Sequence, residues 1–344
     1  MMKRLIVLAL TSFCVVGGAA QQREGRLVAA TMHSRALEKN LLGEPADQPF
    51  VVYLPPSYDT APARRYPVVY LLHGNGGNER SFVDERYQGL NLQTAMDSAI
   101  RAGSGREFIV VMPNANTRYG GSHYVNSPVL GNWADFVTRD LVEHIDKTFR
   151  TIKRVASRGL AGYSMGGRGA LYLAMTVPDV YGAVYALSPG RMAFAAFPPF
   201  DDATWRRVLS ASDTASLPPD VRTAFGFAAA YSPNPSTAPF VEFPVRVEEN
   251  QLKVIKTVFD RWIAKDPITL VQTHADRLRK LRAIHFSCGT EDPLIGPNRL
   301  LAELLAKAGL KFNFEEFNGD HTSRVRIQVE TRIIPMFSNQ LAFE

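Results

Sequence analysis

The amino-acid sequence predicts an α/β fold with a mostly parallel sheet of about eight strands, helices on both of its faces and an insertion after the sixth strand. Two observations lead to this prediction. Eight short runs are rich in β-branched and aromatic residues, and from the third run onward most are separated by helical patterns, as in parallel strands joined by crossovers. With 46% hydrophobic residues in a chain of 344, one domain over residues 21–344 can bury a large core.

The expected strands differ in how their apolar residues are arranged. Val68–Leu72 and Ile109–Met112 are apolar without alternation, which is typical of strands buried on both faces. We expect the first two runs to pair antiparallel at one edge. The eight runs are Leu27–Met32, Pro49–Leu54, Tyr66–Leu72, Phe108–Met112, Arg154–Ala161, Ala183–Leu187, Ala283–Cys288 and Lys311–Phe317.

Several helix ends are marked by residues that cap or break helices. Asn132 can cap a helix that runs to about residue 149. A second helix begins just after Ser164 and stops before Pro178. A third, over residues 297–308, has leucines at helical spacing and ends at Gly309.

The insertion after the sixth strand differs in composition from the rest of the chain. It is rich in proline and aromatic residues between 191 and 243, which indicates an irregular, partly helical segment. Two interpretations stand side by side: a cap over an active site, or helices packed on the outer face of the sheet. Residues 251–281 have the pattern of ordinary covering helices.

The first twenty residues predict a cleavable secretory signal. Lys3 and Arg4 precede an apolar run from Leu5 to Val16, and small residues follow it. The run is about 12 residues long, shorter than the ~20 that a spanning helix needs. We therefore expect a secreted or periplasmic protein without a stable membrane span; a retained N-terminal anchor is the alternative.

Charge and cysteine content exclude several classes of function. The formal net charge is +6, but the basic residues are scattered, so we expect no nucleic-acid partner. Cys288 is the one cysteine outside the expected signal, so no intrachain disulfide can form. We expect it to be a buried core thiol. No Cys and His cluster has metal-ligand spacing, and we expect neither metal nor cofactor.

A candidate nucleophile stands in the run Gly162-Tyr163-Ser164-Met165-Gly166. A strand precedes this run and a helix follows it, and a serine at such a sharp turn exposes its hydroxyl. The flanking glycines permit the close packing of the turn. The alternative is a structural serine in a turn.

The remaining groups of a catalytic triad follow in the chain order nucleophile, acid, base. His321, the last of seven histidines, lies in a polar turn after the final expected strand. Asp292 follows the strand 283–288 at the edge where ligands gather in open α/β sheets. We expect it to orient the His321 imidazole. Neighbouring Glu291 and Asp320 are weaker candidates for the acid.

A glycine-rich loop supplies donors for an oxyanion. It follows the third expected strand as His73-Gly74-Asn75-Gly76-Gly77. Backbone N–H groups of Asn75, in this loop, and of Met165, after the nucleophile, can face a developing negative charge. His73 more plausibly supports the loop than takes part in chemistry, and a plain turn is the alternative for the whole loop.

At these motifs the chain resembles the esterase D-like branch of the α/β-hydrolases. That branch includes feruloyl esterases, S-formylglutathione hydrolases, enterochelin esterases and mycolyltransferases of the antigen 85 type. The resemblance covers roughly Phe50–Pro189 and Ala283–Phe337. The matching pieces are Pro67-Val68-Val69-Tyr70-Leu71-Leu72-His73-Gly74, Asp140-Leu141-Val142-Glu143-His144-Ile145-Asp146, Gly159 through Leu171, Cys288-Gly289-Thr290-Glu291-Asp292, and His321.

The resemblance implies an α/β-hydrolase fold and the same triad of Ser164, Asp292 and His321, with Met165 at the oxyanion. Together with the expected signal, it implies an exported carboxylesterase that works through an acyl-enzyme on a small-molecule or polysaccharide-linked ester, such as a feruloyl or acetyl ester. The chain departs from many relatives at Thr322, where they have an aromatic residue. That departure affects the adjacent pocket rather than the base.

Three other functions use the same residues or the same scaffold. An acyltransferase of the mycolyltransferase type differs only in the alcohol that replaces water. A peptidase shares the triad. A catalytically inactive exported binding protein would keep the scaffold without the chemistry. No residue pattern indicates an oligomeric state.

Overall fold

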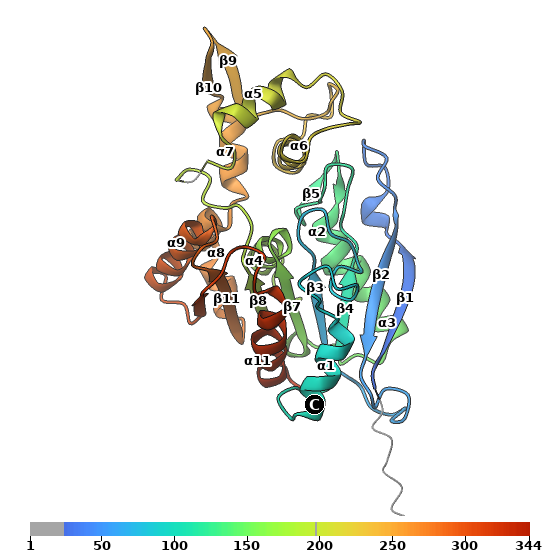
Figure 1. Ribbon diagram of the computed structural model, residues 1–344. Coiled ribbons are helices and arrows are strands. Elements are labelled where there is room, and N and C mark those ends of the chain that lie inside the picture. The colour runs from blue at the N-terminus through green and yellow to red at the C-terminus, as the bar shows by residue number, and fades with distance from the viewer. Residues whose placement is uncertain (1–23, 197) are drawn as a thin grey trace, which may run out of the picture.

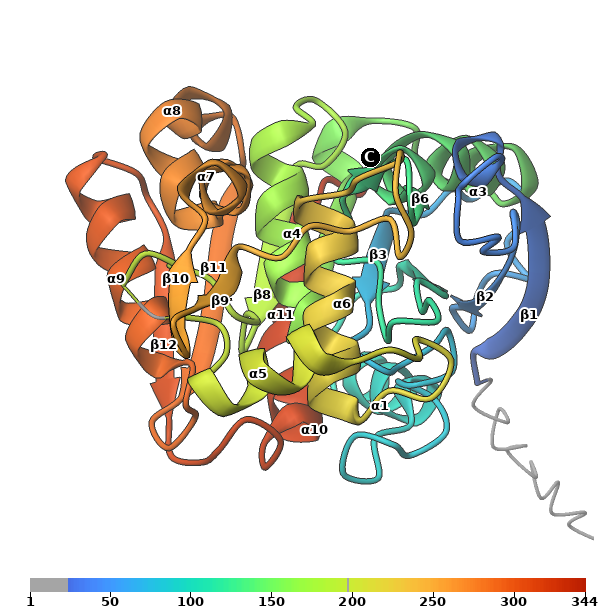
Figure 2. The same ribbon diagram turned by 90° about the horizontal axis from the view of Figure 1, so that it is seen from above.

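The computed structural model describes residues 24–196 and 198–344, so the expected signal peptide of residues 1–20 lies outside the described residues. An eight-stranded sheet runs through the molecule in the order β1-β2-β4-β3-β7-β8-β11-β12 (Figures 1 and 2). The eight strand predictions are therefore confirmed. The strands are β1 (Arg26–His33), β2 (Asp47–Leu54), β3 (Val68–Leu72), β4 (Ile109–Pro113), β7 (Arg158–Tyr163), β8 (Ala183–Leu187), β11 (Ala283–Gly289) and β12 (Asn313–Phe317).

Most of the sheet is parallel. Strands β4, β3, β7, β8, β11 and β12 pair in parallel from one neighbour to the next. Strand β1 pairs antiparallel with β2, and β2 pairs antiparallel with β4, so the expected antiparallel edge is confirmed. Because the parallel strands point the same way, the loops after β3, β7, β11 and β12 all emerge at one edge.

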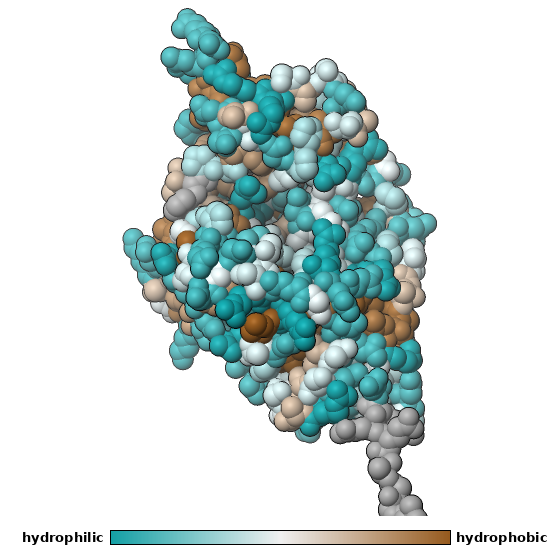
Figure 3. Space-filling view, viewed as in Figure 1, coloured by the Kyte–Doolittle hydropathy of each residue, from teal (hydrophilic) through white to brown (hydrophobic). Residues whose placement is uncertain are grey.

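Helices cover both faces of the sheet, and each face has its own apolar core. One core joins alternate strand residues such as Tyr70 and Val111 to α3, α4, α8 and α9. The other joins residues such as Val69 and Val110 to α1, α10 and α11. The bounds are α1 (Leu92–Arg101), α3 (Leu141–Thr148), α4 (Met165–Thr176), α8 (Pro267–Arg279), α9 (Ile295–Lys307), α10 (Val325–Gln328) and α11 (Ile334–Gln340). The face in Figure 3 is mostly hydrophilic with small separate apolar patches.

The helix expected from Asn132 to about residue 149 is interrupted. Short α2 (Trp133–Asp135) leads through a π-helical turn (Phe136–Asp140) into α3. The Asn132 side chain makes no capping hydrogen bond. Instead the side chain of Asn126 accepts from the Asp135 N–H at 3.1 Å. Asn126 reaches this position because β5 (Asn126–Ser127) pairs with β6 (Gly131–Asn132).

The insertion consists of helices and one hairpin. Helices α5 (Asp202–Ser210) and α6 (Pro219–Tyr231) precede strands β9 (Val245–Glu248) and β10 (Gln251–Val254), and α7 (Lys256–Ala264) follows. In Figure 1 these elements stand above one end of the sheet. Only helices were expected for residues 251–281. This prediction is wrong at its start, where residues 251–254 form the second strand of the hairpin. Its four-residue strands are mostly exposed, so they have little of the apolar pattern by which strands are recognised.

Neither a membrane span nor a metal cluster is found in the described part of the chain. Over residues 24–196 and 198–344 no helix is both long and apolar enough to cross a bilayer. The same residues contain no group of three or more His, Cys, Asp and Glu side chains arranged to hold a metal ion.

The turn between β7 and α4 packs backbone directly against backbone. A Cβ on Gly166 would lie 2.1 Å from the carbonyl oxygen of Leu72, and one on Gly162 would lie 2.2 Å from the carbonyl carbon of Gly166. Real Cβ contacts are not this short. Glycine at both positions therefore lets the first turn of α4 approach the ends of β3 and β7.

We predict that Gly166→Ala destabilises the protein by about 3 kcal/mol or more, because backbone atoms cannot move aside for the methyl group. Gly103→Ala is the control, since its Cβ meets nothing within 4 Å and only its positive φ of +72° opposes the change. We expect that control to cost about 1–2 kcal/mol. Urea unfolding measures both, and equal losses would contradict the steric argument.

Candidate active site

Ser164 lies at the turn between β7 and α4 with a backbone that residues other than glycine seldom adopt. Its φ is 55° and its ψ is −115°. Two hydrogen bonds hold this conformation: the Ser164 N–H donates to the Leu187 carbonyl at 2.9 Å, and the Ser164 carbonyl accepts from the Gly190 N–H at 2.8 Å. A strained serine at a strand-to-helix turn presents its hydroxyl outward.

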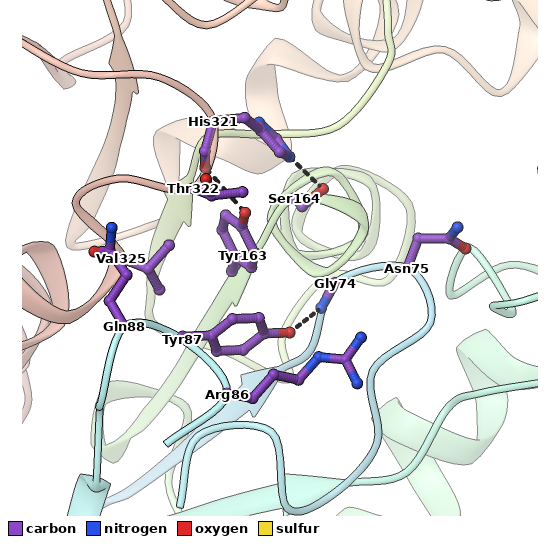
Figure 4. Close-up of a pocket in the computed structure, with 10 residues that line it drawn as sticks. All are labelled: Gly74, Asn75, Arg86, Tyr87, Gln88, Tyr163, Ser164, His321, Thr322 and Val325. Atoms are coloured by element: carbon purple, nitrogen blue, oxygen red, sulfur yellow. Dashed lines mark hydrogen bonds between the residues drawn. The ribbon is translucent and has the colours of Figure 1, made fainter. Parts of the chain in front are cut away.

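A hydrogen-bonded chain joins Ser164 to the two other predicted triad residues (Figure 4 shows Ser164 and His321). The Oγ of Ser164 lies 2.9 Å from Nε2 of His321. The other ring nitrogen of His321, Nδ1, lies 2.7 Å from Oδ2 of Asp292. The structure thus brings together three residues that are up to 157 positions apart in the sequence.

Asp292 is fixed from several sides. It lies after β11 with its side chain fully buried. Its Oδ1 accepts from the Leu294 N–H at 2.9 Å, and its Oδ2 also lies 3.5 Å from the Sγ of Cys288. Burial and the Asp292 carboxylate raise the pKa of the Cys288 thiol, so Cys288 stays protonated. The prediction that Cys288 is buried agrees with its exposure of 0%.

The loop that carries His321 is shaped by its neighbours. The hydroxyl of Tyr163 donates to the His321 carbonyl at 2.9 Å. The Oδ1 of Asp320 accepts from the N–H groups of Thr322 and Ser323, both at 2.8 Å, while the imidazole nitrogens contact Asp292 and Ser164. Asp320 therefore shapes the turn and does not compete with Asp292.

The two predicted oxyanion donors border the same space beside Ser164. Asn75 and Met165 both line a cavity with Ser164. Both side chains also flank Gly121, whose Cβ would lie 3.0 Å from Oδ1 of Asn75 and 2.2 Å from Sδ of Met165. In the described part of the chain, neither backbone N–H donates to another protein group.

His73 supports the loop of Asn75, as expected. The Ala115 N–H donates to its Nε2 at 2.9 Å, which leaves Nδ1 as the donor to the Gly74 carbonyl at 2.8 Å. Burial lowers the pKa of His73 to about 4, so the ring is neutral near pH 7. The Tyr124 hydroxyl donates to the His73 carbonyl at 3.0 Å.

Two cavities meet at Ser164. The larger, about 420 Å³, is lined by His321, Thr322, Tyr87 and Arg86, among others (Figure 4). In it the Tyr87 hydroxyl accepts from the Gly74 N–H at 3.2 Å. The smaller, about 80 Å³, has no contribution from His321. Its lining is Asn75, His123, Ser164, Met165, Arg168, Gly190, Arg191, Thr223 and Phe227.

Several lining residues were not found from the sequence. Arg168 lies in the first turn of α4, and its position just after the serine motif was the one available signal. His123, Arg191 and Tyr87 lie outside the sheet in segments without a recognisable motif. Their roles depend on contacts between distant segments, such as the 3.2 Å hydrogen bond from Nδ2 of Asn75 to Oγ1 of Thr223 in α6.

The fold is that of the α/β-hydrolases, and comparison with known proteins agrees with this class. The family model described as "Putative esterase" matches residues 45–325. The chain therefore belongs to this esterase family, whose members act on carboxylic esters, and the resemblance and enzyme class predicted from the sequence are confirmed.

The individual proteins that the chain resembles share limited sequence identity with it. An esterase of Mycobacterium tuberculosis is 36% identical over 125 residues, which is 35% of this chain and 24% of that protein. The solved structure of a ferulic acid esterase covers 93% of this chain and 100% of its own, with 21% identity and a TM-score of 0.66. An S-formylglutathione hydrolase of Staphylococcus aureus covers 92% and 99%, with 18% identity and a TM-score of 0.58.

We predict that the free energy of unfolding falls as the pH is lowered from 6.5 towards 4. Unfolded His73 takes up a proton near its ordinary pKa of 6.5, whereas the folded protein resists protonation down to about 4. Stability from this group is complete above pH 6.5 and its loss reaches about 3 kcal/mol near pH 4. Burial lowers the pKa of His123 as well, so its effect has the same sign.

Urea unfolding at pH 7.5, 6.5, 5.5 and 4.5 measures this dependence. The variant His123→Asn removes one of the two histidines, and its stability should change less between pH 6.5 and 4.5 than that of the parent protein. A free energy of unfolding that stays constant over this interval would refute the assignment of neutral buried imidazoles.

Proposed function

We propose that this protein is an exported serine carboxylesterase that cleaves esters through an acyl-enzyme. The observation that carries the proposal is the chain of two hydrogen bonds, 2.9 Å from Ser164 Oγ to His321 Nε2 and 2.7 Å from His321 Nδ1 to Asp292 Oδ2. This is the arrangement in which a histidine activates a serine hydroxyl and a buried carboxylate holds the histidine tautomer.

The proposed reaction has two steps. Ser164 Oγ attacks the ester carbonyl and passes its proton to His321 Nε2, which then delivers that proton to the departing alcohol. Water next attacks the acyl-enzyme, gives its proton to the same imidazole and releases the carboxylic acid with free Ser164. The N–H groups of Asn75 and Met165 bind the carbonyl oxygen while it is negatively charged.

The position of His321 supports a proposal for which part of the ester each cavity holds. Because His321 must protonate the leaving oxygen, the alcohol occupies the larger cavity that His321 lines. The acyl group then occupies the smaller cavity next to Met165. Its volume of about 80 Å³ favours short acyl groups over a feruloyl group, while the larger cavity suits a sugar-linked alcohol.

We propose further that residues 191–243 form a cap. Thr223 and Phe227 of α6 line the acyl cavity, and Thr223 holds the side chain of Asn75.

The proposal that the protein is exported rests on the residue pattern of the first twenty residues, with its basic start and short apolar run.

Replacing the proposed nucleophile tests the mechanism. We expect Ser164→Ala to lower kcat for p-nitrophenyl acetate by about 10⁴-fold or more and to abolish labelling by a fluorophosphonate probe. Ser210→Ala, at the exposed end of α5, is the matched control. Near-normal turnover by Ser164→Ala would refute the assignment, and an unlabelled, inactive parent protein would favour a binding protein.

Product analysis separates hydrolysis from acyl transfer. With p-nitrophenyl acetate and excess glycerol we expect free acetate as the main product, because nothing in the proposed mechanism requires an acceptor other than water. Acetylated glycerol as the main product would instead identify a transferase that uses the same triad. Chromatography of the quenched mixture measures both.

A further inference from the structure

The acyl cavity carries positive charge that the proposed reaction does not use. Arg168 is only 1% exposed, yet it lies on the wall of this cavity. Its guanidinium contacts the Tyr231 hydroxyl and donates to the Lys265 carbonyl at 3.3 Å. Its Nε has no hydrogen-bond partner among the residues that the structure describes.

Two further groups point to the same cavity. His123 is 3% exposed, and within the described chain its Nε2 also lacks a hydrogen-bond partner. Arg191 is exposed and borders the cavity, where its Nε donates to the Pro199 carbonyl at 2.8 Å. A buried polar atom without a partner is costly, and two of them at one cavity indicate a polar ligand.

No carboxylate of the described chain neutralises this charge directly. The carboxylate that acts on Arg168 is Asp266, but it forms no ion pair with it. Its two oxygens already accept from the N–H groups of Phe194 at 2.8 Å and Ile268 at 3.1 Å. Burial lowers the pKa of Arg168 only to about 10, so the guanidinium stays charged at neutral pH.

The neighbours of Arg168 respond to its charge. Lys265 is held by the Ala230 carbonyl at 2.8 Å, and its pKa falls to about 8 through burial and the nearby Arg168 and Arg261. The pKa of His123 is lowered by burial and then by the charges of Arg168 and Arg191. The potential in this region is therefore positive and favours an anionic group.

We propose that the protein acts on esters of short dicarboxylic acids, whose free carboxylate binds Arg168 and Arg191 in the acyl cavity while Ser164 attacks the esterified end. This inference rests on the proposed function and on its assignment of the cavities. A volume of about 80 Å³ admits an acyl group of a few heavy atoms, as in a succinyl monoester. An arginine fork matches a carboxylate in geometry as well as in charge.

A pair of nearly isosteric substrates tests the proposal. Monomethyl succinate carries the carboxylate, and methyl succinamate replaces it by a neutral amide of the same shape. Hydrolysis of the first gives methanol and succinate by the two steps above. We expect kcat/KM, measured by methanol release, to be about 10- to 100-fold higher for the carboxylate substrate.

Variants test whether Arg168 and Arg191 cause the preference for the carboxylate substrate. Arg191→Gln should bring the ratio of the two kcat/KM values towards one, and Arg168→Met should do the same. The matched control is Arg222→Gln, because Arg222 lies on the exposed side of α6. This variant should keep the parent ratio of the two kcat/KM values. If Arg168→Met does not fold, the parent ratio and the exposed Arg191 variant still decide the question.

The outcomes separate this inference from the proposed function. A protein that cleaves p-nitrophenyl acetate but hydrolyses the amide substrate as fast as the acid, or hydrolyses neither methyl ester, overturns the dicarboxylate proposal alone. An Arg191→Gln variant that retains the full ratio overturns it as well. A protein that neither cleaves p-nitrophenyl acetate nor reacts with a fluorophosphonate overturns the proposed esterase itself.

Discussion

The close approach of helix α4 to the ends of β3 and β7 is the constraint on which the site depends. Glycines at 162 and 166 permit it, since a methyl group at either would overlap backbone atoms. The approach forces Ser164 into a positive φ, and the hydrogen bonds to Leu187 and Gly190 hold it there. The hydroxyl thereby stands at the edge of the sheet where the loops with His321 and Asp292 also emerge.

Buried neutral side chains hold the loops that surround Ser164. His73 links the loop of Asn75 to the segment of Ala115, and the direction of each hydrogen bond fixes a single tautomer. Tyr163 ties the end of β7 to the backbone of His321. These contacts position the proposed oxyanion donor and the proposed base through neutral groups.

The parts of the molecule with a regular apolar period could be predicted from the sequence. All eight sheet strands, helix α4 and the grouping of Ser164, Asp292 and His321 follow from periodicity, turn residues and chain order. The hairpin at 245–254 could not, because exposed four-residue strands bury little apolar surface. Nor could the meeting of Arg168 with His123, which depends on how segments far apart in sequence pack around one cavity.

The hydrogen bond between Thr223 and Asn75 joins two parts of the chain that differ in how tightly their packing constrains them. The groups proposed to make and break bonds are held by the sheet, whose backbone contacts tolerate few substitutions. Arg191, Thr223 and Phe227, which line the smaller cavity beside Ser164, belong instead to the insertion between β8 and β11. Substitutions in this insertion therefore reshape one wall of the cavity and leave in place the contacts that join Ser164, His321 and Asp292.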